Sequence, residues 1–195
     1  MLTREQSAKV ENWRSRGFHL FELTNLKCAQ LIENELTGMD SAHQKQLLGK
    51  KTGTGDTVLH YAVRNEDMKT LKMLLKFPVN VNENNNLHRT SLHLAAADGN
   101  LEMIAVLLAA GANPALTDFQ YNRAIHIAAS CHHLDVVKIL YAKDPESISI
   151  RGHNGKLPVE FVDKQTGSDL ILFFKSVQPD ARVIAHQDGV SPGKK

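Results

Sequence analysis

The chain has 195 residues, of which 42% are apolar and 23% charged, and its formal net charge is +2. This composition excludes an intrinsically disordered chain. The longest apolar run, residues 103–110, is far shorter than the ~20 residues that cross a bilayer. No cluster of Lys or Arg is longer than two residues, so the cationic patch of a nucleic-acid-binding protein is missing. We therefore expect neither a membrane nor a nucleic acid as partner.

The cysteines and the first residues indicate a compartment. Two cysteines, Cys28 and Cys131, are too few for a disulfide framework. The first six residues include charged side chains where a signal peptide needs an apolar stretch. We therefore expect a reducing, cytoplasmic location.

The first 50 residues carry no recognisable motif but have the apolar spacing of helices. Residues 26–36 place apolar side chains on one helical face. Asp40 or Ser41 is expected to cap a further helix that runs to Leu48. We interpret residues 1–50 as a helical N-terminal cap or extension; the alternative is that residues 7–23 bind a partner.

An internal repeat with a period of 33 residues begins after this segment. The six residues 57–62 return as 90–95 and as 123–128, and a weaker copy, 157–162, follows after 34 residues. A second apolar landmark, at 74–75, returns at 107–108, 140–141 and 173–174. Two landmarks that share one period over four units indicate a repeat protein.

Each unit has the composition of two short helices and a loop. In the second unit, an apolar run around Leu92 has helical spacing, Gly99 interrupts it, and a second run begins at Leu101. Gly111 then ends the second helix, and Pro114 prevents it from resuming. Such a unit cannot bury its apolar faces alone, so stacked copies should form an all-α solenoid.

The unit resembles the ankyrin repeat, whose Thr-Pro-Leu-His-x-Ala signature opens the first helix. The segment 90–95, Thr-Ser-Leu-His-Leu-Ala, is the best of the copies. The resemblance predicts an ankyrin-repeat domain at residues 51–178, with a partly flexible tail at 179–195. Its repeats are expected at about 53–85, 86–118, 119–151 and 153–178.

Two copies depart from the ankyrin pattern. The third has Arg123 in place of the signature Thr and one inserted residue near Asp144, so its loop should be irregular. The fourth has Glu160 in place of His and diverges most, as a terminal capping repeat should.

The resemblance gives the recurring polar residues and glycines a structural role. It implies that the signature His hydrogen-bonds the neighbouring Thr and loop backbone, and so joins one repeat to the next. The residues concerned are Thr57, His60, Thr90, His93, His126, Gly99 and Gly111. Histidines one repeat apart are too far from each other to share a zinc ion, which needs ligands ~2.1 Å away. We expect no metal site and no cofactor.

Catalytic patterns are weak. Cys131 lies beside His132, but no orienting group or oxyanion site accompanies the pair. The segment 49–52, Gly-Lys-Lys-Thr, lacks the earlier glycine of a phosphate-binding loop. We expect Cys131 to be a free thiol and the protein to have no catalytic residue and no enzymatic activity.

The resemblance places a partner-binding surface on the loop tips and on the exposed edge of each first helix. The expected tip residues are Asn86, Leu87, Arg89, Phe119, Gln120, Tyr121, Asn122, His153, Asn154 and Lys156. The expected helix residues are Arg64, Asn65, Ala97, Asp98, Ser130, Cys131, Lys164 and Gln165. Aromatic anchors concentrate interface energy, which singles out Phe119. Tyr121 occupies a turn position typical of glycine, so this hairpin should be distorted. The alternative is that both aromatic side chains pack against neighbouring loops.

Fold and surface together predict a non-enzymatic protein–protein interaction module, an adaptor, scaffold or regulatory binder that is monomeric alone. Two alternatives stay open at this point. One is a bacterial effector that binds a host protein in the host cytosol. The other is a regulatory subunit of an enzyme complex.

Overall fold

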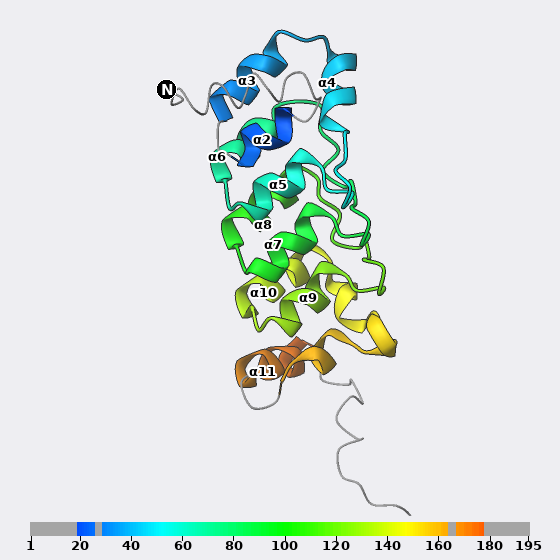
Figure 1. Cartoon of the computed structure of the whole chain (residues 1–195). Coiled ribbons are helices and arrows are strands. Elements are labelled where there is room, and N and C mark those ends of the chain that lie inside the picture. The colour runs from blue at the N-terminus through cyan, green and yellow to red at the C-terminus, as the bar shows by residue number, and fades with distance from the viewer. Residues whose placement is uncertain (1–18, 26–28, 164–166, 178–195) are drawn as a thin grey trace, which may run out of the picture.

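Short helices stack in pairs into an elongated column in the computed structural model, which describes residues 19–25, 29–163 and 167–177 (Figure 1). The α-helices are α2 (His19–Asn25), α3 (Ala29–Thr37), α4 (Ser41–Leu48), α5 (Val58–Arg64), α6 (Met68–Leu74), α7 (Ser91–Asp98), α8 (Leu101–Ala109), α9 (Ala124–Ser130), α10 (Leu134–Lys143) and α11 (Ser168–Val177). Three 3-10 helices are η1 (Pro145–Ser149), η2 (His153–Gly155) and η3 (Pro158–Phe161). The described residues contain no strand, which confirms the predicted all-α repeat solenoid.

The helices form two layers. The inner helices α5, α7 and α9 contact one another in chain order, and η3 continues this layer. Each inner helix also packs against the outer helix that follows it in the chain, α6, α8 or α10. The core buries alanines of the inner helices against aliphatic side chains of the outer helices: Ala62, Ala95, Ala128, Leu71, Ile104 and Val137. Each large side chain buried here stabilises the fold by about 1.5–3 kcal/mol. None of the described helices is both long enough and apolar enough to cross a membrane.

The N-terminal helices extend this stack by one unit. Helix α2 packs on α5, and α3 packs on α6, so the pair repeats the arrangement of the repeats that follow. Leu23, Ile32 and Leu36 are fully buried in the same core. The predicted cap of α4 is Asp40, whose side chain accepts hydrogen bonds from the backbone of Ala42 and His43. The boundary placed at residue 51 stays a prediction, and residues 7–18 lie outside the described residues.

The C-terminal end of the stack differs from the repeats before it. The loop after α10 contains η1, in line with the irregular loop predicted from the inserted residue. The inner helix of the last unit is the 3-10 helix η3, with Pro158 in its first turn. The carboxylate of Glu160 accepts a hydrogen bond from the backbone N–H of Leu157 (2.7 Å). Glu160 thus caps this turn as the signature His does elsewhere.

Hairpin turns project to one side of the column, at residues 52–56, 85–89, 118–122 and 151–156 (Figure 1). The same turn position is left-handed in each, with φ of 78° at Gly55, 55° at His88, 64° at Tyr121 and 72° at Gly155. Tyr121 donates its backbone N–H to Asp118 over 2.9 Å, as His88 does to Asn85. The prediction of a distorted hairpin at Tyr121 is therefore wrong. The turn keeps its hydrogen bonds, and the backbone of Tyr121 adopts the left-handed conformation that usually favours glycine.

This strain yields a first prediction, for Tyr121→Gly. A left-handed backbone costs an L-residue about 1–2 kcal/mol, and glycine avoids this cost. Part of the gain is cancelled because glycine has more conformational entropy to lose from the unfolded chain. We expect the free energy of unfolding to rise by up to about 1 kcal/mol in urea titrations. Gln120→Gly, one position earlier, is the matched control and should lower it. A destabilised Tyr121→Gly protein would show that the left-handed backbone at Tyr121 stores no strain.

Candidate functional site

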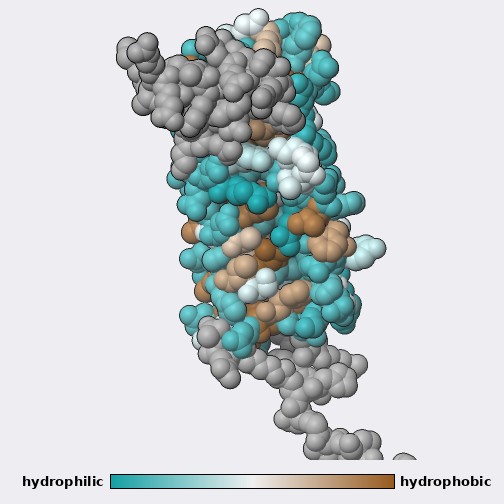
Figure 2. All heavy atoms as spheres, in the orientation of Figure 1, coloured by the Kyte–Doolittle hydropathy of each residue, from teal (hydrophilic) through white to brown (hydrophobic). Residues whose placement is uncertain are grey.

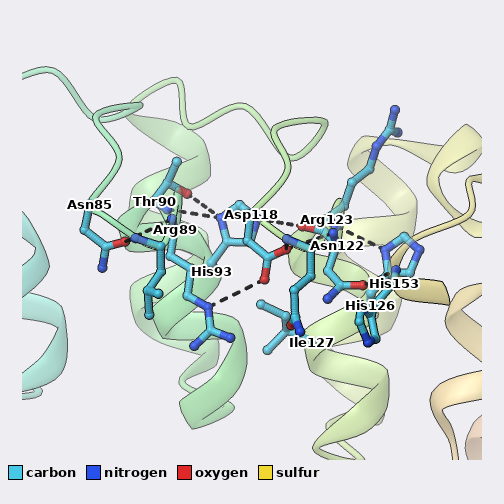
Figure 3. A network of polar contacts seen from close by, with 12 residues as sticks. Asn85, Arg89, Thr90, His93, Asp118, Asn122, Arg123, His126, Ile127 and His153 are labelled. Atoms are coloured by element: carbon cyan, nitrogen blue, oxygen red, sulfur yellow. Dashed lines mark hydrogen bonds and ion pairs between the residues drawn. The ribbon is translucent and has the colours of Figure 1, made fainter. Parts of the chain in front are cut away.

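A ladder of buried histidines joins each repeat to the next. The backbone N–H of Thr57 donates to Nδ1 of His60 (3.2 Å), and Nε2 of His60 donates to the carbonyl oxygen of Arg89 in the following hairpin (2.9 Å). His93 makes the same pair of bonds, to Thr90 and to the carbonyl oxygen of Asn122 (3.2 Å). Figure 3 shows His93 of this ladder beside the hairpin residues of the second and third turns. Each histidine therefore fixes the position of a hairpin tip.

The third rung of the ladder has a different cap. The backbone N–H of Arg123 donates to Nδ1 of His126 (3.2 Å), and Nε2 of His126 reaches the carbonyl oxygen of Ile150 (2.9 Å). Where the first two repeats have a Thr hydroxyl, the third has the Arg123 guanidinium, which pairs with Asp144 (2.8 Å). This ion pair ties the inner helix to the irregular loop that follows α10.

The histidines are neutral in the folded protein. Burial lowers the pKa of His60, His93 and His126 below the ordinary 6.5, although the hydrogen bond to a carbonyl oxygen opposes this shift. Each Nδ1 accepts a backbone hydrogen bond, so adding a proton there would remove the acceptor. The ladder therefore requires the uncharged ring.

A second set of bonds closes the turns from within. The side-chain oxygen Oδ1 of Asp118 accepts the backbone N–H groups of Gln120 and Asn122, both over 2.9 Å. Asn85 does the same in the preceding turn, for Leu87 and Arg89. These turns are thus held by their first residue, which is buried in both cases.

Ion pairs compensate the buried carboxylates of the hairpin turns. The Nε atom of Arg89 lies 3.6 Å from Oδ2 of Asp118, whose side chain has no exposure to solvent. Arg64 pairs with the buried carboxylate of Asp56 over 3.1 Å. Arg64 and Arg89, both predicted to bind a partner, thus neutralise buried acids of the hairpin layer.

Other predicted contact residues also serve the stack. Asn122 is buried, and its side-chain oxygen accepts the backbone N–H of His153 (2.9 Å). Asn122 therefore does not belong to the candidate surface, and its side chain stabilises the contact between neighbouring repeats. The Asn86 amide donates to the carbonyl oxygen of Gly53 (2.9 Å), and the Asn65 amide contacts the carbonyl oxygen of Thr24 (3.5 Å).

Exposed apolar side chains gather on two neighbouring tips. Among the described residues, the large apolar side chains that are exposed are Leu87, Leu101, Phe119, Tyr121 and Leu172. Three of these five lie on the tips of the second and third hairpins: Leu87 (47% exposed), Phe119 (52%) and Tyr121 (73%). The backbone N–H of Phe119 donates to the carbonyl oxygen of Leu87 (3.1 Å), so the two turns are in direct contact. The alternative that Phe119 and Tyr121 are packed away against loops does not fit this exposure.

An apolar stripe on the inner helices was not predicted from the sequence. It consists of the residue after each signature His, together with its equivalent in η3: Tyr61, Leu94, Ile127 and Phe161, all of them half-buried. Figure 2 shows apolar residues between hydrophilic ones on the face of the inner helices and hairpins. The signal was present in the chain, since these apolar residues recur with the period of the repeat beside the histidines.

The other predicted residues of the helix edge are mostly exposed. Asp98, Ser130 and Cys131 are exposed, and Ala97 is half-buried. Partial burial raises the pKa of Asp98 above its ordinary value, and the charge of Glu66 acts in the same direction. Lys164 and Gln165 lie outside the described residues. At the fourth tip Asn154 and Lys156 are exposed and His153 is half-buried.

The described residues contain no group of three or more His, Cys, Asp or Glu side chains that could hold a metal ion. The adjacent pair His132 and His133 points to different repeats. Nε2 of His132 accepts the backbone N–H of Asp163 (3.2 Å), whereas Nε2 of His133 bonds the carbonyl oxygen of Ala97 (3.0 Å). Cys131 is a free, exposed thiol, as the sequence predicts.

The histidine ladder gives a second prediction, a loss of stability in weak acid. Below pH 6.5 the unfolded chain binds protons at these histidines and the folded chain does not, so the free energy of unfolding falls as the pH falls. Each histidine contributes a slope of up to about 1.4 kcal/mol per pH unit. We expect this fall in denaturant titrations between about pH 7 and pH 5.5.

Matched variants test the assignment of this slope. His93→Gln should remove about one third of it, since one of three equivalent buried rings is lost. His88→Gln, which replaces an exposed imidazole outside the ladder, is the matched control. A free energy of unfolding that stays constant over this pH range would contradict the ladder.

The ion pair of Arg89 gives a third prediction. Arg89→Met leaves the buried carboxylate of Asp118 without its cation, and should lower the free energy of unfolding by about 1–3 kcal/mol. Asp118→Asn reproduces the amide that Asn85 supplies in the preceding turn. In that background Arg89→Met should cost much less, which a double-mutant cycle in urea measures as a coupling of about 1 kcal/mol or more. Equal costs in the two backgrounds would exclude the pair as a source of stability.

Comparison with known proteins bears on the whole stack. A family model described as Ankyrin repeats (3 copies) matches residues 25–118 and 59–151, which together cover more than half of the chain. The first match includes α3 and α4, in agreement with the extra unit at the N-terminal end. A search of curated proteins finds no match. Ankyrin repeats are generally modules for protein–protein interaction. The family match and the stacked helix pairs together show that the chain belongs to the ankyrin-repeat family.

Proposed function

We propose that this chain is a non-enzymatic adaptor or regulatory binder that docks a protein partner on the face of its hairpin tips and inner helices. We call this surface the tip face; it comprises Leu87, Phe119 and Tyr121 on the tips and the stripe Tyr61, Leu94, Ile127 and Phe161 beside them. A reducing cytoplasmic location is part of the proposal and suits the exposed free thiol of Cys131.

The observation that carries the proposal is the clustering of exposed apolar side chains on adjoining tips. Large exposed apolar groups cost solvation free energy, and clusters of them on a folded surface mark sites of association. Aromatic side chains are also the commonest anchors of protein interfaces. The outer helices α8 and α11 expose single leucines, Leu101 and Leu172, which need no such explanation.

Rigidity supports the same function. The histidine ladder and the turn bonds fix the backbone of each tip before any partner arrives. A surface that is already ordered loses little conformational entropy on docking, so more of the contact free energy appears as affinity. The mechanism we propose is therefore presentation of a preformed surface.

Our fourth prediction tests the tip face. Crosslinking capture from the lysate of the source cell should recover a partner with the wild-type chain. The variant Leu87→Ala/Phe119→Ala should recover it at least about 10-fold less, because two exposed anchors are removed without loss of core packing. The matched control is Leu101→Ala/Leu172→Ala, which removes two exposed leucines from the outer helices. Equal capture by wild type and tip variant would refute the tip face as the binding surface.

A further inference from the structure

The tips carry an uneven distribution of charge. Within the four turns 52–56, 85–89, 118–122 and 151–156, the only carboxylates are those of Asp56 and Asp118, and both are buried. The cations of the same turns are Arg89, Arg151 and Lys156. Arg89 compensates Asp118. Within these four turns, solvent therefore meets cations but no carboxylate; the nearby exposed carboxylates, of Glu160 and Asp98, belong to the inner helical layer.

The excess positive charge lies at one end of the row of tips. Arg151 bonds the carbonyl oxygen of Gly155 (2.6 Å) and lies 3.9 Å from Glu160, so its charge is partly compensated. Lys156 is exposed, its Nζ atom lies 6.0 Å from the centre of the Phe161 ring, and it forms no ion pair with a described carboxylate. An exposed ammonium group beside an aromatic ring is placed to meet an anion while its stem covers apolar surface.

Apolar anchors and this cation follow one another along the stack. Leu87 belongs to the second turn, Phe119 and Tyr121 to the third, and Lys156 to the fourth. Neighbouring turns are bonded to each other, by Phe119 to Leu87 and by His153 to Asn122. A partner that runs along the row therefore meets apolar surface first and positive charge next.

We propose that the tip face recognises a short protein segment with two or more aliphatic or aromatic side chains and, to one side of them, an Asp or Glu. The apolar side chains contact Leu87, Phe119 and Tyr121, and the carboxylate lies against Lys156. This inference rests on the proposed function, because it names the chemistry of the partner at the same surface. The apolar contact supplies affinity, whereas the charge pair fixes direction and speeds association.

The fifth prediction uses a random dodecapeptide library displayed on phage as the probe, and the full chain as the bait. We expect the enriched peptides to combine aromatic or aliphatic residues with an Asp or Glu displaced to one end. With Lys156→Glu as the bait, the enriched charge should change to Lys or Arg. Lys175→Glu, which reverses an exposed charge on α11, is the matched control and should enrich the same peptides as the wild type.

Affinities of one enriched peptide then separate the two contributions. Phe119→Ser should weaken binding at least about 10-fold. Lys156→Glu should weaken it at least about threefold, mainly by slowing association, and this loss should shrink as salt is raised to about 0.5 M. Peptides without an acidic bias, peptides whose binding ignores Phe119→Ser, or no enrichment at all would each overturn the inference.

The failure of this inference and that of the proposed function are distinguishable. A cellular partner that requires Leu87 and Phe119 while no acidic peptide binds leaves the proposed function intact and refutes the acidic segment. A partner that ignores the tip variant refutes both.

Discussion

The interaction on which the rest of this structure depends is the hydrogen bond from a buried, neutral imidazole to a backbone carbonyl oxygen further along the chain. This oxygen belongs to the next hairpin turn for His60 and His93, and to Ile150, just before the last turn, for His126. His60, His93 and His126 each accept a backbone N–H at one nitrogen and donate from the other across the repeat boundary. A single ring thus caps its own helix and holds the following turn. Hydrophobic burial brings the repeats together, but it is not directional. The imidazole supplies the direction, so the tips project on one side of the column (Figure 1).

Fixing the tips in this way determines which side chains remain for recognition. The first residue of a turn is used to close it, as Asn85 and Asp118 show, and Arg89 is needed to neutralise the second of these. Asn122 is used between turns. At the second position of its turn, Asn86 still bonds the preceding turn. The stack has no such need of Leu87, Phe119 and Tyr121, whose exposed apolar side chains stand at the second to fourth positions. Their apolar character is therefore not explained by folding, which is why we assign it to binding.

The sequence predicted the fold because the period of 33 residues appears in the order of residues alone. The cap of α4 at Asp40 and the irregular loop after α10 were predictable for a similar reason, since both depend on neighbours in the chain. The site was less predictable. Arg89 and Asn122 had the position of contact residues, but their partners Asp118 and His153 lie 29 and 31 residues further along the chain, in another repeat. The strain at Tyr121 was predicted, but the sequence alone did not show whether the turn would break its hydrogen bonds to relieve it. The hydrogen bonds are kept, because the buried side chain of Asp118 accepts the backbone N–H of Asn122 and holds the turn closed.

Repeat proteins are stabilised mainly by contacts between neighbours, so a weak boundary is not rescued by a strong one elsewhere. The boundary between the third and fourth units combines several substitutions: Arg123 replaces the capping Thr, η3 replaces an α-helix, and Glu160 replaces the histidine. A partner segment that contacts Leu87, Phe119 and Lys156 would span this boundary from the second unit to the fourth. Any ligand that binds only the folded state stabilises it according to its concentration and affinity. Docking along the tips would then strengthen the boundary that the chain itself builds least regularly.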